Sequence, residues 1–276
     1  MTFDLPLHVE TLGLDPEPGI DTILLVHGYG GSSFSWRYWV PRLTARAHVV
    51  LVDMKGFGSA PKPDDGQYGP KHQSELICRL ILQADFQRVT LIGHSLGGGV
   101  VLGVALSLLD CEPERLKQLV LVASAAYKQR TPPFVSFARH RRLATALLRM
   151  LGAHFVIRHV LKSIVFDQST VTDSQVTGYA EPFDSPEARR ALIDTALAIV
   201  PPDLGKMTAR FKELDVPTLV LWGRHDRVVP LWVGERLANE LPDARIEILE
   251  SCGHMPAEEL PEESWEVLQR FLDDRS

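Results

Sequence analysis

Short runs of apolar residues alternate along this chain with longer segments whose apolar residues recur at helical spacing. Most of the short runs are nearly continuous Val, Ile and Leu, which is typical of strands that are buried on both faces of a parallel sheet. The last run, "RIEILES", alternates more and is expected near a sheet edge. Strands that alternate with helices predict an α/β protein with a mainly parallel sheet and helices on both faces. The expected strands are 22–28, 48–56, 88–95, 118–126, 217–223 and 245–251.

One long interval lacks strand-like runs and contains several amphipathic helical patterns instead. Within it, Ser185 and Pro186 have the residue types preferred at the N-cap and first position of a helix. We interpret residues 127–210 as a helical cap, called the cap segment below. It is inserted into a core made of residues 1–126 and 211–276.

The first half of the cap segment is strongly basic. From residue 127 to 166 it carries eight Lys and Arg residues and no acidic residue. Such stretches are commonly solvated faces, and a docking surface is the alternative. That surface would suit something anionic: a membrane head group, an acidic carrier protein or a charged substrate. The basic residues are Lys128, Arg130, Arg139, Arg141, Arg142, Arg149, Arg158 and Lys162.

Composition excludes several classes of protein. A net charge of −6 over 276 residues argues against a general nucleic-acid binder. No apolar stretch approaches the ~18 residues of a transmembrane helix, and no secretory signal is expected. Three cysteines at irregular spacing favour a reducing compartment, which we interpret as the cytoplasm. Because neither CxxC nor HExxH occurs, we expect no metal site and no cofactor.

A serine between two glycines is the first candidate for chemistry. Ser95 lies in Gly93-His94-Ser95-Leu96-Gly97, after an apolar strand and before a helix. This is the setting of a nucleophile elbow, where a side chain at either glycine would collide across the sharp turn. The helix N-terminus favours developing negative charge, and the N–H of Leu96 is free to bind an oxyanion.

A serine hydroxyl needs a general base, and the base needs an orienting carboxylate. His254 follows the last expected strand, and Asp226 follows the strand before it. The carboxyl ends of parallel strands are where sites form in open α/β sheets. His225 occupies a similar position and is the alternative base. Asp53 is the competing acid, but its glycine-rich neighbours indicate a structural role.

A second glycine-rich turn, "HGYGGS", follows an earlier strand. Such turns also bind phosphates. Here the third glycine of G-x-G-x-x-G is replaced by Ser33, and no Walker lysine follows. We therefore interpret the turn as the second half of an oxyanion hole. The backbone N–H of Tyr29, or less favourably that of Gly30, would face the N–H of Leu96.

With these segments in place, the chain resembles the α/β-hydrolase superfamily along essentially its whole length. The resemblance rests on "HGYGGS", "DMKGFGSA", "GHSLGG", "GRHDRVVP" and "CGHMPAEELPE". The chain order Ser95, Asp226, His254 is the order of nucleophile, acid and base in that superfamily. The resemblance implies an eight-stranded sheet with a cap between strands six and seven, where the cap segment falls.

The resemblance also narrows the chemistry. Dehalogenases and epoxide hydrolases of the superfamily use aspartate as nucleophile, and Ser95 excludes that chemistry. Carbon–carbon hydrolases usually resemble "HGxGPG" and carry Asn before the serine. Here Gly31-Ser32 and His94 look more like esterases, lipases and perhydrolases. We therefore predict a carboxylic ester hydrolase that works through an acyl-enzyme on a small-molecule ester, with its apolar acyl group under the cap. Carbon–carbon or lactone hydrolysis (or perhydrolysis) by the same triad is the alternative, followed by a non-catalytic ligand receptor.

Overall fold

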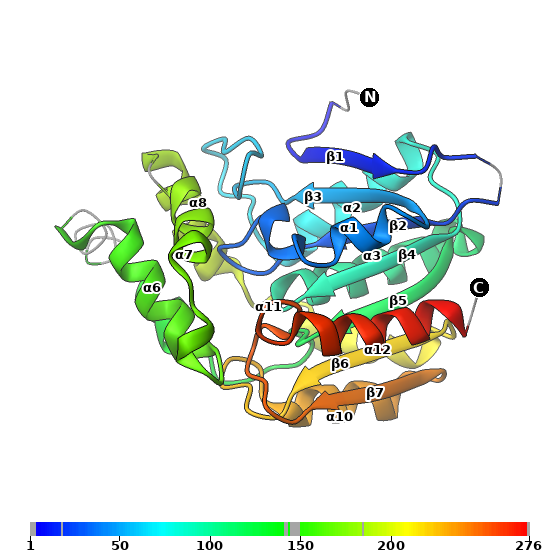
Figure 1. Ribbon diagram of the computed structural model, residues 1–276. Helices are drawn as coiled ribbons and strands as arrows, with labels where there is room; N and C mark the ends of the chain where they lie inside the picture. Colours follow the sequence, from blue (N-terminus) through cyan, green and yellow to red (C-terminus); the bar gives the residue numbers. More distant parts are fainter. Residues whose placement is uncertain (1–3, 18, 141–142, 144–149, 184, 275–276) are drawn as a thin grey trace.

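The computed structural model (Figure 1) describes residues 4–17, 19–140, 143, 150–183 and 185–274. These residues form a sheet of β1 (His8–Gly13), β2 (Thr22–Val26), β3 (His48–Asp53), β4 (Val89–His94), β5 (Leu116–Val122), β6 (Thr218–Gly223) and β7 (Ala244–Leu249). The strand order is β1-β3-β2-β4-β5-β6-β7. Every neighbouring pair is parallel except β1 with β3.

The six strand-like runs each contain a strand, which confirms the predicted parallel sheet. The expected count of eight strands is wrong for the described residues, in which the sheet has seven. Residues 4–7 form bends rather than a strand, and no strand of the described residues pairs with the free edge of β1. β1 itself carries no apolar run, because it is a half-exposed edge strand. β7 lies at the other edge, as its alternation predicted.

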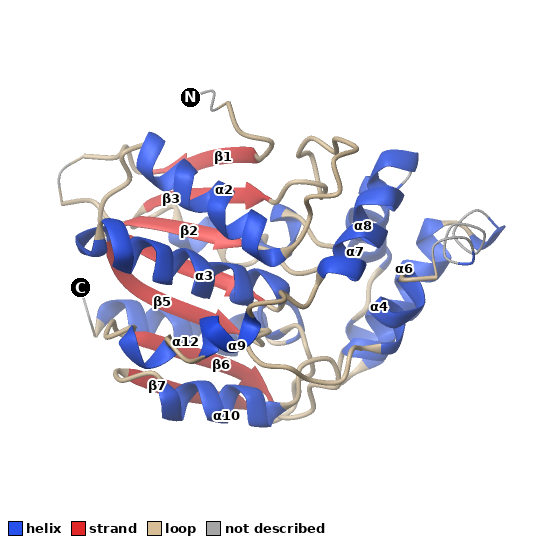
Figure 2. Ribbon diagram, turned by 180° about the vertical axis from the view of Figure 1, so that it is seen from behind, coloured by secondary structure: helices blue, strands red, loops and turns tan. Residues whose placement is uncertain are grey.

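Helices cover both faces of the sheet (Figures 1 and 2). Leu24 and Val26 of β2 belong to the core cluster under α2 (Pro70–Gln83), α3 (Leu96–Cys111) and α10 (Leu231–Glu240). Ile23 and Leu25 belong to the cluster under α1 (Val40–Leu43) and α12 (Pro261–Asp273). Because successive side chains enter opposite cores, the strands read as continuous apolar runs. The helices are α1 (Val40–Leu43), α2 (Pro70–Gln83), α3 (Leu96–Cys111), α10 (Leu231–Glu240), α11 (Pro256–Glu259) and α12 (Pro261–Asp273), with the short 3₁₀ helices η1 (Ser33–Trp36) and η5 (Phe211–Glu213).

Between β5 and β6 the described residues contain helices and no strand. Figure 1 shows α6 (Ala153–Ile164), α7 (Asp173–Ala180) and α8 (Pro186–Ala198) of this segment beyond the ends of the strands β4 to β7, on the side to which their arrows point. Ser185 Oγ accepts the N–H of Ala188 at 3.0 Å and Pro186 begins α8, so the predicted helix start is confirmed. Arg141, Arg142 and Arg149 lie outside the described residues. The helices are α4 (Pro133–Ala138), α6 (Ala153–Ile164), α7 (Asp173–Ala180), α8 (Pro186–Ala198) and α9 (Leu204–Thr208).

None of the helices in the described part of the chain is long and apolar enough to cross a membrane.

Candidate active site

Ser95 stands alone between β4 and α3 in a backbone conformation that L-residues rarely adopt. Its φ is 54° and its ψ is −118°. Such a conformation costs about 1–3 kcal/mol and persists only where the surroundings enforce it. Here the Ser95 N–H donates to the Val122 carbonyl at 2.9 Å, and the Ser95 carbonyl accepts the N–H groups of Ala125 at 2.8 Å and Gly98 at 3.0 Å. These bonds hold the turn that places the Ser95 hydroxyl at the end of β4, in the cavity.

The two glycines of the motif are required by close backbone contacts. A Cβ at Gly97 would lie 2.3 Å from the carbonyl oxygen of Val26. A Cβ at Gly93 would lie 2.5 Å from the carbonyl oxygen of Gly97. Both distances are far inside van der Waals contact, and backbone atoms have little freedom to move away. As expected from the sequence, a side chain at either glycine would therefore collide with the backbone.

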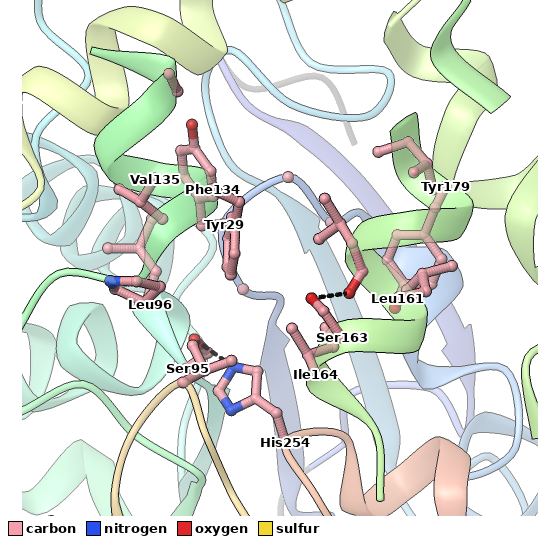
Figure 3. Close-up of a pocket in the computed structure, with 18 of the residues that line it drawn as sticks. Tyr29, Ser95, Leu96, Phe134, Val135, Leu161, Ser163, Ile164, Tyr179 and His254 are labelled. Atoms are coloured by element: carbon pink, nitrogen blue, oxygen red, sulfur yellow. Dashed lines mark hydrogen bonds between the residues drawn. The ribbon is translucent and has the colours of Figure 1, made fainter. Parts of the chain in front are cut away.

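The three predicted triad residues meet at the carboxyl ends of their strands. His254 Nε2 lies 3.0 Å from Ser95 Oγ (Figure 3), and His254 Nδ1 lies 2.8 Å from Asp226 Oδ2. The other carboxylate oxygen, Oδ1, accepts the N–H groups of Val228 at 2.7 Å and Val229 at 2.9 Å. These bonds hold the carboxylate in one orientation. A carboxylate at Nδ1 keeps the proton there, so Nε2 is free to accept the serine proton.

The second glycine turn runs directly against the serine. A Cβ at Gly28 would lie 3.2 Å from the Cβ of Ser95, and the turn is closed by a 3.1 Å bond from the Gly31 N–H to the Gly28 carbonyl. Tyr29 and Leu96 both line the cavity that contains Ser95. Within the described part of the chain, neither of their N–H groups has a hydrogen-bond partner. Two free donors beside the hydroxyl fit the predicted oxyanion hole, whose assignment stays a prediction.

His94 supports the loop that carries His254. Its Nε2–H donates to the His254 carbonyl at 2.8 Å, and the two rings lie 4.8 Å apart. Burial, together with the neighbouring His254, lowers the pKa of His94 to about 3. His94 is therefore neutral at physiological pH and adds no charge next to the candidate base.

The alternative base and the alternative acid have other partners. The His225 ring stacks on Phe166 with centroids 4.6 Å apart. Asp53 accepts the N–H groups of Ser33 at 2.6 Å and Ser59 at 2.8 Å. Asp53 thus ties two loops together, in agreement with the structural role expected for it.

Glu259 organises the loop around His254, a role that the sequence analysis missed. One carboxylate oxygen accepts the Met255 N–H at 2.9 Å. The other accepts the N–H of Gly253 at 2.9 Å and that of Phe166, in the cap segment, at 2.6 Å. The His254 N–H itself donates to the carbonyl of Ile164 at 2.9 Å. The candidate base is therefore held by the end of α6 as well as by its own loop.

A second missed carboxylate, Glu258, joins the core to α7. It forms a 2.5 Å ion pair with Arg37 and accepts bonds from Gln175 Nε2 at 2.9 Å and from the Tyr179 hydroxyl. Burial raises the pKa of Glu258, and Arg37 opposes that effect. No local motif marks this cluster, because its members come from three distant segments.

A cavity of about 760 Å³ opens above Ser95 between the core and the cap segment. Figure 3 shows Phe134 and Val135 on one side of the serine and Leu161 and Ile164 on the other. Burial raises the pKa of the Tyr29 hydroxyl, which donates to the Leu192 carbonyl of α8 at 3.0 Å. Among the described lining residues, Arg227 at the exposed edge is the only Lys, Arg, Asp or Glu. Other apolar lining residues include Phe137, Ala138, Phe155, Val156, Ile157, Val160, Phe183, Ile193 and Ile199.

Comparison with known proteins agrees with this geometry. Residues 23–267 match the model of the alpha/beta hydrolase family. The chain belongs to that family. It is 29% identical to the uncharacterized hydrolase YugF of Bacillus subtilis, over 92% of this chain and 91% of that protein. It is 30% identical to a 2-hydroxy-6-oxononadienedioate/2-hydroxy-6-oxononatrienedioate hydrolase of Paraburkholderia xenovorans, over 93% of this chain and 86% of that protein. An alpha/beta hydrolase fold protein from Burkholderia ambifaria superposes with a TM-score of 0.82 at 25% identity, covering 96% of this chain and 93% of that one.

Proposed function

We propose that this hydrolase cleaves carboxylic esters with an apolar acyl group through an acyl-enzyme on Ser95. The observation that carries the proposal is the chain of contacts from Ser95 Oγ to His254 Nε2 at 3.0 Å and from His254 Nδ1 to Asp226 at 2.8 Å. Of these three residues, Ser95 and His254 line an apolar cavity. A hydroxyl, a base and an orienting carboxylate in this arrangement are what nucleophilic acyl transfer requires.

In the proposed reaction, Ser95 Oγ attacks the ester carbonyl while its proton passes to His254 Nε2. Asp226 stabilises the imidazolium that forms, and the N–H groups of Tyr29 and Leu96 bind the oxyanion. The tetrahedral intermediate then collapses, and the leaving alcohol takes the proton from His254. A water molecule, deprotonated by His254, attacks the acyl-enzyme and releases the acid.

The lining of the cavity favours an uncharged substrate. Arg227 is the only permanently charged side chain among its described lining residues, and it is exposed at the edge. Transfer of a carboxylate into an apolar site is costly unless a cation or hydrogen-bond donors receive it. Apolar acyl groups gain about 0.8 kcal/mol for each CH₂ that they bury.

Carbon–carbon hydrolysis is the second candidate, and the curated relatives favour it. The Paraburkholderia xenovorans relative is named for a hydroxy-oxo-dienedioate substrate. A compound of that kind contains no ester, so its hydrolysis must break a bond between carbon atoms. The same serine, histidine and aspartate would serve that reaction, and Arg227 would have to receive a carboxylate of the substrate.

A substrate panel separates the two candidates. We expect p-nitrophenyl esters to be hydrolysed with kcat/KM rising from acetate to hexanoate, and a 2-hydroxy-6-oxo-dienedioate to react at least a hundredfold more slowly. A panel in which the dienedioate has the higher kcat/KM would replace ester hydrolysis by the second candidate. Ser95→Ala should lower either activity about 10⁴-fold or more, and a variant that keeps wild-type turnover would contradict both.

The proposal includes the division of the chain into a core and a cap. The helices between β5 and β6 support a cap at residues 127–210, because they cover the cavity above Ser95. It also includes a cytoplasmic location. The free thiols of Cys78, Cys111 and Cys252 support that location.

A further inference from the structure

The mouth of the cavity is surrounded by exposed apolar side chains. Phe137, Leu151 and Phe155 line the cavity and are exposed to solvent as well, so they mark its opening. Met150, beside Leu151, is 82% exposed. Six of the eleven large apolar side chains that are exposed in the described part of the chain lie between residues 137 and 166. The three that also line the cavity place exposed apolar surface at one opening, and such surface is typical of interaction sites.

Two stripes of side chains run along α6 beside the mouth of the cavity. Phe155, His159 and Ser163 recur every four residues, and all three are exposed and line the cavity. Arg158 and Lys162 recur at the same spacing, and helical geometry places their stripe next to the first one. An exposed aromatic residue on one stripe of a helix, with partly exposed cations on the next, is typical of attachment to a lipid–water interface.

Basic residues predominate in the segment that contains the mouth of the cavity. Residues 127–166 contain eight Lys and Arg and no acidic residue, although the whole chain has a net charge of −6. Lys128, Arg130 and Arg139 are exposed. Arg158 forms a 2.6 Å ion pair with Asp173, the first residue of α7. Arg139, next to the lining residues Phe137 and Ala138, and Lys162 of α6 therefore place positive charge beside the apolar opening.

We propose that this surface binds an anionic lipid bilayer, from which apolar substrates enter the cavity. It consists of Phe137, Met150, Leu151 and Phe155 with Arg139, Arg158 and Lys162, and is called the mouth face below. Each Lys or Arg near an anionic bilayer contributes about 1 kcal/mol, and the apolar side chains insert among the acyl chains.

Other occupants fit the mouth face less well. An acidic carrier protein would satisfy the cations but leave the protruding Met150 and Phe155 without an apolar partner. A second copy of the chain would bring two positively charged faces together, and like charges in contact cost free energy. The lipid bilayer supplies both anionic head groups and an apolar interior.

Vesicle flotation tests the proposal directly. We expect the full chain to float with vesicles of phosphatidylcholine and phosphatidylglycerol at 7:3 and to stay behind with pure phosphatidylcholine. Ser95→Ala protein should float equally well, so the binding result is independent of the proposed ester hydrolysis. The double variant Met150→Ser/Lys162→Glu should bind at least roughly tenfold more weakly, since it removes an insertion point and reverses one charge.

The matched control is Lys212→Glu, which reverses an exposed lysine in η5, in the core. It should bind within twofold of the wild type. Met150, Lys162 and Lys212 do not line the cavity. The double variant and the control should therefore both hydrolyse a soluble short-chain ester at the wild-type rate. The proposal is overturned if the wild type binds neither vesicle, if the mouth-face variant binds as well as the control, or if only an acidic carrier or self-association is detected.

Discussion

The substitution Asp226→Asn tests the proposed triad because it replaces one carboxylate oxygen by an NH₂ group of similar size. The expected consequence is that the proton of His254 moves from one ring nitrogen to the other. Asp226 Oδ1 accepts the N–H groups of Val228 and Val229, so the oxygen of an asparagine must take that place. Its NH₂ group then occupies the position of Oδ2, which lies 2.8 Å from His254 Nδ1. A donor at that position forces Nδ1 to accept and places the proton on Nε2. The imidazole can then no longer take the proton of Ser95.

The expected loss is large because the wrong tautomer is fixed by geometry. The equivalent substitution in serine proteases lowers kcat about 10⁴-fold, which is a barrier increase of about 5.5 kcal/mol. Stability should change by less than about 1 kcal/mol, because both N–H groups of the loop keep an acceptor. Asp226→Ala is the matched comparison. It leaves those two groups without their acceptor, at about 1–3 kcal/mol for each, and should lower the melting temperature as well as kcat.

The assay is kcat on a soluble p-nitrophenyl ester, with the melting temperature of the same preparations measured by circular dichroism. Asp226→Asn that keeps kcat within tenfold of the wild type, at an unchanged melting temperature, would refute this reasoning. Asp226 would then not orient the base, and the carboxylate would be a structural group of the loop.

Three further substitutions test how the site is held. Gly97→Ala should destabilise the fold by about 1–3 kcal/mol, because the new Cβ meets the Val26 carbonyl at 2.3 Å; an unchanged melting temperature would show that the turn can relax. Tyr179→Phe removes a donor from the buried carboxylate of Glu258 and should cost about 1–3 kcal/mol in urea denaturation, whereas a neutral result would mean that water replaces the hydroxyl. The folded-state pKa of His94 is about 3, below its ordinary 6.5, so its contribution to stability falls as the pH drops below 6.5. His94→Gln should therefore show a smaller loss of unfolding free energy between pH 7 and pH 5 than the wild type, and equal losses would contradict the assignment.

The sequence predicts those features of the fold that leave a signal within a short stretch of residues. The parallel strands are recognisable because each is buried on both faces and is continuously apolar. Ser185 is recognisable because a cap and a following proline are local signals. β1 was not predicted, because a half-exposed edge strand such as "HVETLG" carries no periodic apolar signal. The eighth strand was expected from the family resemblance and not from a pattern of residues, and the sheet has seven strands in the residues that the structure describes.

Some residues of the candidate site could likewise be predicted from local patterns, and others could not. That Ser95, Asp226 and His254 lie close together could be predicted, because each lies on the loop that follows a strand and parallel strands bring such loops to one edge. The cluster of Glu258, Arg37 and Tyr179 was not predictable. Its members lie far apart in the chain, and only the packing of α7 against the core brings them together. The mouth face could be anticipated only by its charge, because exposure of its apolar side chains depends on how the helices pack.

Labelling with a fluorophosphonate tests the central claim most directly. The probe reacts only with a serine that a neighbouring base activates, so its adduct, located by mass spectrometry of the digested protein, reports the nucleophile. We expect one adduct, on Ser95, that the wild type forms rapidly and that His254→Ala does not form. A wild-type chain that is folded but unlabelled, or labelled at another residue, would contradict it.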